Sequence, residues 1–373
     1  MNNNTRKRVL VLGCTGSIGT STIDIIRNMS DKFEVAGLSA NKSKDELEKL
    51  AAEFNCPYSL YSEEGETGLK RLIKESGADI AVNGVAGAAG LMPSVYVLEN
   101  GIDLALANKE TVVMAYPLVK QIAQAHNAKI LPVDSEHSAI FNLVERYKTE
   151  NIESLIITAS GGPFRELPKE KLASVTVEDA LNHPTWKMGK KITLDSADLA
   201  NKGLEVIEAC RLFGFSADKV EVVVHPQSLI HSMIRTKDGE VYAQISEPDM
   251  KHPILSALTW SDVVPNYLPK FDITKHTLSF FPPRYDDFPL LKYAFEAARR
   301  DKSTTIAFNA ANEVAAYAFL DKKCAFLDIP KIVRAVLDES WDKEPSSIEE
   351  VRAEDAKARK LAEDVLNKIG ANK

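Results

Sequence analysis

Short apolar runs alternate with amphipathic segments through the first third of the chain. Apolar, β-branched runs predict strands at 9–12, 33–38, 79–82, 102–107 and 129–133. Between them, apolar residues recur at helical spacing, most plainly over 17–28 and 44–54. Regular alternation of strand and helix is typical of a doubly wound parallel sheet. We therefore predict an α/β fold with a Rossmann-like domain over residues 1–133.

The pattern changes after this region. Strand-like runs at 152–158 and 220–224, and a hairpin around Lys237-Asp238-Gly239, predict a mixed sheet in a central α+β domain over residues 134–262. A proline-containing stretch, 263–286, is expected to be a linker. Helical periodicity from Leu290 onward predicts a C-terminal helical bundle over 287–373.

Composition narrows the class of protein. Charged residues make up 27% of the chain and hydrophobic residues 45%, which is typical of a globular protein. The formal net charge of -7 disfavours nucleic acid as a partner. The apolar run at 9–12 is too short for a membrane span or signal peptide, and the four cysteines form no CxxC pair. We expect no membrane partner, reduced thiols and a cytoplasmic location.

A glycine-rich turn follows the first predicted strand and opens the first predicted helix. It reads Gly13-Cys14-Thr15-Gly16-Ser17-Ile18-Gly19, which suits close approach of a dinucleotide pyrophosphate to backbone amides. The second strand is followed by Ala40-Asn41-Lys42, with no acidic residue to hold a ribose hydroxyl. This favours NADPH over NADH. The alternatives are an ordinary strand-to-helix turn and a solvated surface lysine.

Acidic residues follow the predicted strand 129–133. In an extended chain, Asp134 and Glu136 would face one side and offer hard oxygen ligands to Mg²⁺ or Mn²⁺. The alternative is a helix N-cap followed by a first-turn glutamate. A third ligand is available in Glu205 or Glu208, between which the pattern does not choose.

Several polar residues lie at the ends of strands or in segments without periodicity. Ser160, Ser196, Asn201 and Lys202 could together bind a phosphate group, although each alone is an ordinary loop or helix residue. The segment 183–189, with His183, Trp186 and Met188, suggests a lid over a site, or a loop anchored by its tryptophan. Lys109 and His225, which also follow strands, are candidates for substrate or metal-shell contacts, or are structural.

Taken in order, the motifs resemble one family over nearly the whole chain. GCTGSIG, GAAGL, ANKE, LPVDSEH, SGGPFR, HPTWKMG, NKGLE, HPQSLIHS and NAANE together closely resemble the 1-deoxy-D-xylulose 5-phosphate reductoisomerases. The resemblance implies conversion of that phosphorylated sugar to 2-C-methyl-D-erythritol 4-phosphate, in non-mevalonate isoprenoid biosynthesis. The carbon skeleton rearranges and the resulting aldehyde is reduced by NADPH. It also implies a divalent cation (Mg²⁺, Mn²⁺ or Co²⁺) and a homodimer.

The resemblance also implies residue roles. The metal ligands would be Asp134, Glu136 and Glu205, which favours Glu205 over Glu208. Substrate contacts would come from Lys109, Ser135, Glu136, Ser160, His183, Ser196, Asn201, Lys202 and Glu205, with Trp186 and Met188 in a lid over 183–191. Lys109 and Glu136 are candidates for proton transfer. Cofactor contacts would come from Thr15, Gly16, Ser17, Ile18, Ala40, Asn41, Lys42, Asn108, Glu110 and Gly189; Asn41 stands where the family commonly has glycine.

Two other interpretations remain open at this stage. A semialdehyde-type dehydrogenase shares a similar glycine turn but requires a nucleophilic cysteine, for which Cys14 and Cys210 are the candidates. A non-catalytic NADP-sensing protein would need no acidic cluster.

Overall fold

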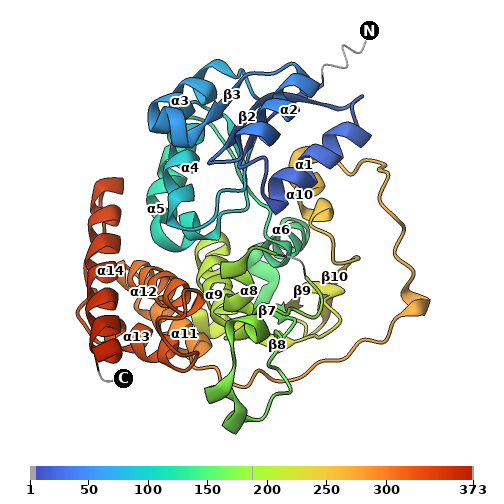
Figure 1. Cartoon of the computed structure of the whole chain (residues 1–373). Coiled ribbons are helices and arrows are strands. Elements are labelled where there is room, and N and C mark those ends of the chain that lie inside the picture. The colour runs from blue at the N-terminus through green and yellow to red at the C-terminus, as the bar shows by residue number, and fades with distance from the viewer. Residues whose placement is uncertain (1–5, 187, 372–373) are drawn as a thin grey trace. The chain divides into compact units, whose positions relative to one another are not determined.

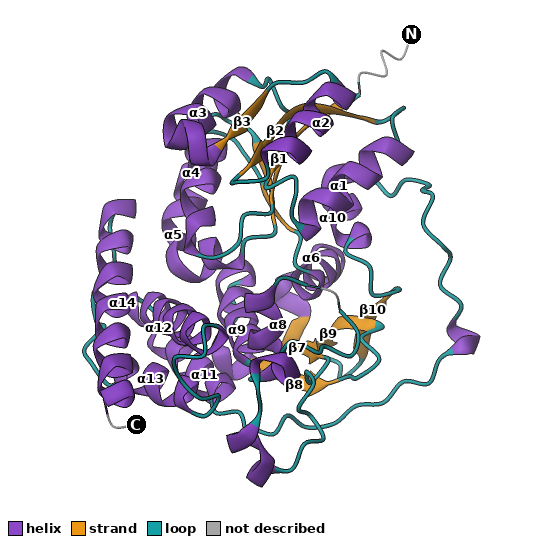
Figure 2. Ribbon diagram, viewed as in Figure 1, coloured by secondary structure: helices purple, strands orange, loops and turns teal. Residues whose placement is uncertain are grey.

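The computed structural model describes residues 6–186 and 188–371, which divide into two compact units. Unit 1 comprises residues 1–111, 117–138 and 249–271, and unit 2 comprises 112–116, 139–248 and 272–373. The secondary structure of both is drawn in Figure 2. The four-segment division predicted from the sequence stays a prediction.

Unit 1 is built on a six-stranded parallel sheet with the strand order β3-β2-β1-β4-β5-β6. This is the doubly wound arrangement of dinucleotide-binding folds, so the predicted N-terminal architecture is confirmed. The strands are β1 (Lys7–Leu12), β2 (Phe33–Ala40), β3 (Tyr58–Leu60), β4 (Ile80–Asn83), β5 (Asp103–Leu106) and β6 (Ile130–Pro132).

The helices of this part of the chain follow the strands (Figure 1). They are α1 (Ser17–Asn28), α2 (Lys44–Phe54), α3 (Tyr61–Glu75), α4 (Leu91–Glu99), α5 (Lys109–Ala125), the first turn of α6 (Ser135–Tyr147) and α10 (Lys251–Thr259). Helices α1 and α2 have the predicted bounds. Val9 to Leu12 of β1 are fully buried, as are Ile25 and Thr22 of α1. Apolar periodicity therefore sets both the type and the inward face of these elements.

Unit 2 contains a second, mixed sheet of order β10-β9-β7-β8. Its strands are β7 (Ile152–Ala159), β8 (Val220–Val224), β9 (Ile230–Thr236) and β10 (Val241–Ile245). Strands β7 and β8 are parallel, whereas β9 pairs antiparallel with both β7 and β10. The hairpin predicted around Asp238 is confirmed, since Gly239 donates a backbone hydrogen bond to Thr236 of 2.9 Å.

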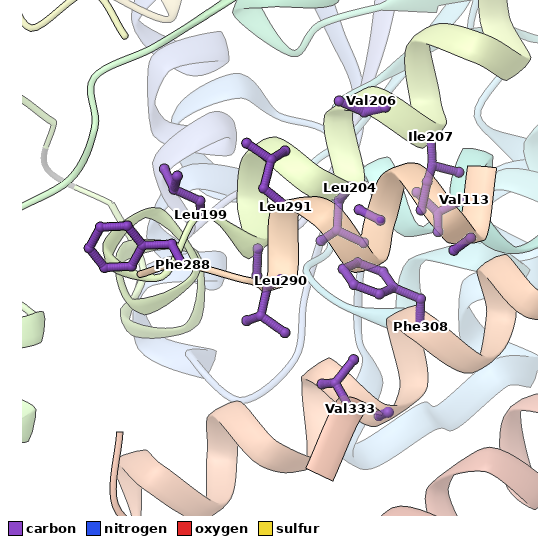
Figure 3. Packing of buried hydrophobic residues seen from close by; sticks show 14 of the residues in the cluster. Val113, Leu199, Leu204, Val206, Ile207, Phe288, Leu290, Leu291, Phe308 and Val333 are labelled. Atoms are coloured by element: carbon purple, nitrogen blue, oxygen red, sulfur yellow. The ribbon is translucent and has the colours of Figure 1, made fainter. Parts of the chain in front are cut away.

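The helices of unit 2 share one hydrophobic core. They are α7 (Val177–Ala180), α8 (Lys190–Ala197), α9 (Ala200–Phe213), α11 (Leu290–Arg300), α12 (Ser303–Leu320), α13 (Asp328–Leu337) and α14 (Ile348–Ala371). Figure 3 shows Leu204 and Ile207 of α9 beside Phe308 of α12, all almost completely buried. The C-terminal helices therefore pack against the helix that carries Glu205 and stabilise its position.

Two further features bear on the predictions. The stretch 263–286 contains neither α-helix nor strand, apart from an isolated bridge between Phe281 and Val224. Within the described residues, no helix is both long and apolar enough to cross a membrane.

Candidate active site

The glycine-rich turn lies at the carboxyl end of β1, next to the point in the sheet where the strand order reverses. Backbone N–H groups of Gly13 and Cys14 both donate to the carbonyl of Ser39 on β2, at 2.9 Å. Helix α1 then begins at Ser17, and no side chain caps its first amides. An uncapped helix N-terminus at a strand reversal is a favourable place for an anionic pyrophosphate.

Gly19 allows α1 to approach this turn closely. A Cβ atom at this position would lie 2.3 Å from the carbonyl oxygen of Gly13 and 2.4 Å from the Cα of Cys14. Both are backbone atoms that cannot rotate away. The third glycine of the motif is therefore required by the close packing of α1 on the turn that follows β1.

An exposed cation follows the carboxyl end of β2. Ala40, the last residue of β2, is buried, while Asn41 and Lys42 are exposed. An exposed ammonium at this position is compatible with binding a 2′-phosphate.

Asn108 sets the start of α5. Its side-chain oxygen accepts from the Thr111 N–H at 3.0 Å, while its amide nitrogen donates to the carbonyl oxygens of Val85 and Gly87 and to Glu110. Asn108 is thus the N-cap of α5 and anchors the loop that follows β4. This capping role was missed in the sequence, although an Asn at the end of a strand and before a helix is the signal for it.

Lys109, the first residue of α5, forms a buried ion pair with Asp134. Its ammonium lies 2.8 Å from Asp134 Oδ2, and the side chain of Lys109 is only 7% exposed. Burial raises the pKa of Asp134, but Lys109 and His137 outweigh this effect and hold that pKa well below its usual range. His137 was not assigned a role from the sequence; its Nδ1 lies 3.7 Å from Asp134 Oδ2. Asp134 is therefore a carboxylate at neutral pH.

The extended conformation expected for residues 134–136 is wrong. Helix α6 already begins at Ser135, and the Ser138 N–H donates to the Asp134 carbonyl at 2.8 Å. Glu136 is therefore a first-turn helical residue, as in the alternative interpretation, and accepts a hydrogen bond of 2.7 Å from its neighbour Ser135. Its negative charge near a helix N-terminus is electrostatically favourable. The two-residue period of a strand therefore does not apply here, and it gives no reason for Asp134 and Glu136 to face one site.

In unit 2, His183 connects the two serines expected to bind phosphate. Its Nε2 lies 3.0 Å from Ser160 Oγ and 3.1 Å from Ser196 Oγ. Its Nδ1 accepts hydrogen bonds from the backbone N–H groups of Thr185 and Trp186. Since Nδ1 is an acceptor, the proton of the neutral ring is on Nε2 and points to the serines. Burial lowers the pKa of His183, which favours this neutral form.

The other polar candidates of unit 2 lie in the first two turns of α9. Asn201 donates to Glu205 Oε1 at 2.6 Å, and the Lys202 ammonium forms an ion pair with Glu205 Oε2. Glu205 is 1% exposed, as is Glu208 on the same helix. Glu205 therefore contacts two of the expected phosphate ligands, and its choice over Glu208 stays a prediction.

The predicted lid, 183–191, contains loop from His183 to Gly189 and then the first turn of α8. Residue 187 lies outside the described residues. Trp186 is half-buried, with its ring 6.2 Å from that of His231, and Met188 is also half-buried. Both side chains thus expose part of their apolar surface, as a segment that closes over a ligand would require.

The contacts of His225 favour the structural alternative. Its Nδ1 lies 2.9 Å from the Ser279 carbonyl, and its Nε2 accepts from the Leu229 N–H at 3.2 Å. The side chain is fully buried and stacks on Phe280. Both ring nitrogens contact backbone groups, so His225 fixes loops at the end of β8, and its candidate contact with substrate or the metal shell stays a prediction.

The strand order of unit 1 and the glycine turn at β1 define a Rossmann-type, dinucleotide-dependent class of enzyme. Comparison with known proteins identifies the family. The model of 1-deoxy-D-xylulose 5-phosphate reductoisomerase matches residues 9–64 and 57–116, its C-terminal domain model matches 130–213, and the DXP reductoisomerase C-terminal domain model matches 245–361. The chain belongs to the 1-deoxy-D-xylulose 5-phosphate reductoisomerase family.

Individual relatives agree over almost the full length. The reductoisomerase of Treponema denticola is 50% identical, with 96% of each chain covered, and that of Chlorobaculum tepidum is 44% identical, covering 96% of this chain and 100% of the relative. The Zymomonas mobilis enzyme in complex with NADPH is 39% identical with a TM-score of 0.88, over 97% of this chain and 99% of that one. A DOX-P reductoisomerase in complex with NADPH, fosmidomycin and magnesium is 35% identical with the same TM-score, covering 97% and 98%.

Proposed function

We propose that Asp134, Glu136 and Glu205 bind the divalent cation with which this enzyme converts 1-deoxy-D-xylulose 5-phosphate to 2-C-methyl-D-erythritol 4-phosphate. The chain is an NADPH-dependent reductoisomerase of isoprenoid biosynthesis. One observation supports the assignment of Asp134 and of the dinucleotide turn. The same edge of the unit 1 sheet presents a dinucleotide turn after β1 and a buried Lys109–Asp134 pair after β5 and β6.

The donor set suits a hard cation. Carboxylate oxygens are the ligands that Mg²⁺ and Mn²⁺ prefer. Asp134 and Glu205 are each mostly or fully buried, and each is neutralised by a buried lysine, Lys109 and Lys202. Buried carboxylates need a positive charge. A bound divalent cation would add to the positive charge that the two lysines already supply to these carboxylates.

The two bound groups supply different chemistry. When bound, NADPH provides the reducing equivalent and the cation polarises the oxygen atoms of the substrate. Thr15, Gly16, Ser17 and Ile18 would bind the pyrophosphate through the start of α1, and Ala40, Asn41 and Lys42 would surround the adenosine phosphate. Glu110 and Gly189 remain proposed cofactor contacts, whereas Asn108 would contribute by holding the loop after β4 in place.

The substrate phosphate would be bound by Ser160, Ser196, Asn201 and Lys202. The Nε2–H of His183 points to the two serines, so their own hydroxyl protons are free to point to phosphate oxygens. Binding energy from this remote group orients the reacting carbons. Ser135 would contact a substrate hydroxyl.

Proton transfer is proposed for Lys109 and Glu136. Lys109 is held at the start of α5 by the Asn108 cap, and Glu136 by its bond from Ser135, so both have defined positions. Trp186 and Met188, in the segment that begins at His183, would cover the substrate and exclude water.

A cysteine-dependent dehydrogenase is disfavoured. Burial raises the pKa of Cys14 to about 12, and burial followed by the charge of Asp301 raises that of Cys210 to about 12. Neither thiol provides the thiolate that such chemistry needs.

We further propose that the enzyme acts as a homodimer in the cytoplasm and accepts Mn²⁺ or Co²⁺ in place of Mg²⁺. No disulfide joins the four cysteines, in keeping with a reducing compartment. Strand β10 is at the edge of its sheet, where backbone groups can pair with a second copy. Light scattering should give twice the 41.1 kDa of one chain; a monomer would contradict the dimer.

The test of the whole proposal is oxidation of NADPH by the purified chain with 1-deoxy-D-xylulose 5-phosphate. Turnover should require Mg²⁺ or Mn²⁺ and stop with EDTA. Asp134→Asn, Glu136→Gln and Glu205→Gln should each reduce turnover and raise the cation concentration needed for half-maximal rate. Unchanged cation dependence in all three variants would refute the ligand assignment.

A further inference from the structure

Helix α8 connects the lid segment to the phosphate-binding residues. It begins at Lys190, directly after the loop that contains His183 and Trp186, and it carries Ser196 in its last turn. Ser196 is one of the two serines that His183 contacts. The position of α8 therefore determines where one phosphate ligand lies and where the lid ends.

A buried carboxylate on α8 is held from the C-terminal part of the chain. Asp195, the neighbour of Ser196, is 1% exposed and forms an ion pair of 2.7 Å with Lys191 one turn earlier. Its Oδ1 also accepts a hydrogen bond of 3.1 Å from the side-chain amide of Asn312. Asn312 lies on α12, is fully buried, and belongs to the NAANE segment, to which the proposed catalytic and binding residues give no role.

The phosphate loop packs closely on the same part of α8. At Gly162, where φ is +65°, a Cβ atom would lie 2.4 Å from the carbonyl oxygen of Ser196 and 2.9 Å from the Cα of Ala197. The loop that follows Ser160 is therefore in direct backbone contact with Ser196, the second of the two serines. A small movement of α8 must also move this loop, because the contact leaves no space to absorb it.

We propose that Asn312 is a positioning residue for the substrate phosphate: it fixes Asp195, and through the rigid last turn of α8 it sets the spacing of Ser196 and Ser160 around His183. The proposal rests on the proposed role of these serines as phosphate ligands. Asn312 is not among the residues proposed to contact substrate or cofactor. Its effect comes from the buried hydrogen bond that its amide donates to Asp195. Without this bond, the Asp195 carboxylate would move toward other partners.

The test uses Asn312→Ala in the full chain, with Asn309→Ala as matched control. Asn309 lies on the same helix and is equally buried, but its amide makes no hydrogen bond to any described residue, and hence none to α8. Two measurements are needed: the dissociation constant for inorganic phosphate by calorimetry, and the KM values for both substrates. Asn312→Ala should weaken phosphate binding and raise KM for the sugar phosphate about tenfold, with KM for NADPH changed less than about twofold.

An exchange of partners separates positioning from simple destabilisation. Asn312→Asp places a second carboxylate against Asp195 and should weaken phosphate binding more than Asn312→Ala does. Adding Asp195→Asn restores an amide-to-carboxylate bond with the roles reversed but removes the carboxylate that pairs with Lys191, so the double variant should recover part of the phosphate affinity lost in Asn312→Asp.

Three results would overturn the inference: equal loss of phosphate binding in Asn309→Ala and Asn312→Ala, a lower melting temperature for Asn312→Ala with unchanged phosphate affinity, or no recovery in the double variant. Failure of the proposed function would look different. The original chain would then bind phosphate without oxidising NADPH in the presence of the sugar phosphate, and the calorimetric comparison would still decide the role of Asn312.

Discussion

The glycine turn offers a sharp test of how the fold produces cofactor binding, through the variant Gly19→Ala. The added methyl carbon would lie 2.3 Å from the Gly13 carbonyl oxygen, whereas real Cβ contacts are essentially never below 3.0 Å. Helix α1 must therefore move away from the turn by at least about 0.7 Å, the difference between these two distances. The amides that face the pyrophosphate move with it.

The energetic cost follows from two opposing effects. Overpacking against immobile atoms costs up to about 3 kcal/mol. Replacing glycine by alanine within a helix returns about 1 kcal/mol. The net loss of about 2 kcal/mol should lower the melting temperature of a unit of this size by roughly 4–8 °C. Displacement of the helix N-terminus should raise the dissociation constant for NADPH on the order of tenfold.

Gly16→Ala is a control for stability alone: a Cβ there meets only the Gly13 oxygen, at 3.4 Å, but Gly16 is itself a proposed pyrophosphate contact. It should change stability by no more than about 1 kcal/mol, the usual range for an N-cap replacement. Thermal melts would be compared for both variants, and titration of NADPH fluorescence would compare Gly19→Ala with the original chain. The reasoning would be refuted if Gly19→Ala had the same melting temperature as Gly16→Ala and the same dissociation constant for NADPH as the original chain. Close packing of α1 on the turn would then not determine the geometry of the cofactor site.

Other substitutions test separate parts of the site. Glu205→Gln should reduce kcat far more than NADPH affinity, while Glu208→Gln, equally buried on the same helix, should preserve the cation dependence of the rate; equal effects would argue against Glu205 as the ligand. Lys42→Ala should reduce the preference for NADPH over NADH about tenfold, measured as the ratio of kcat/KM values, and an unchanged ratio would leave the lysine a surface residue. Iodoacetamide should leave turnover intact because Cys14 is buried with a raised pKa, and rapid inactivation that NADPH prevents would contradict this. Burial lowers the pKa of His183, so its contribution to stability is complete above the unfolded pKa of about 6.5 and is lost as pH falls through the lower folded pKa. In His183→Asn the free energy of unfolding should therefore fall less steeply below about pH 6.5. An identical slope in the variant and the original chain would refute the neutral, buried state of His183.

Sequence periodicity predicted the elements whose side chains face one core. The bounds of α1, α2 and β8 match the prediction because apolar spacing and local turn residues agree there. The short strand β3 and helix α3 were not predicted. Gly65, with φ of +59°, interrupts α3 near its start, and most of the first turns of that helix are polar, so the periodic signal is weak.

Residues around Asp134 show a different limit. The local sequence was compatible with both an extended chain and a capped helix, and the structure has a helix from Ser135 onward. The pairing of Lys109 with Asp134 joins the ends of two neighbouring strands, which only the strand order brings together. The same holds for Asn312 and Asp195, which are 117 positions apart. The spacing of residues along the chain does not predict such contacts, because they depend on how the helices and strands pack.

The pairing of each buried carboxylate with a lysine couples the binding of the cation to the binding of the substrate. Lys109 balances Asp134, and Lys202 balances Glu205, so neither carboxylate is left as an uncompensated charge before a cation arrives. A divalent cation bound by Asp134 and Glu205 would weaken these two ion pairs, and the ammonium groups would then interact more strongly with a nearby anion. A phosphorylated substrate is such an anion, and its binding in turn favours retention of the cation. Cation and substrate should therefore each increase the affinity for the other, by the same factor.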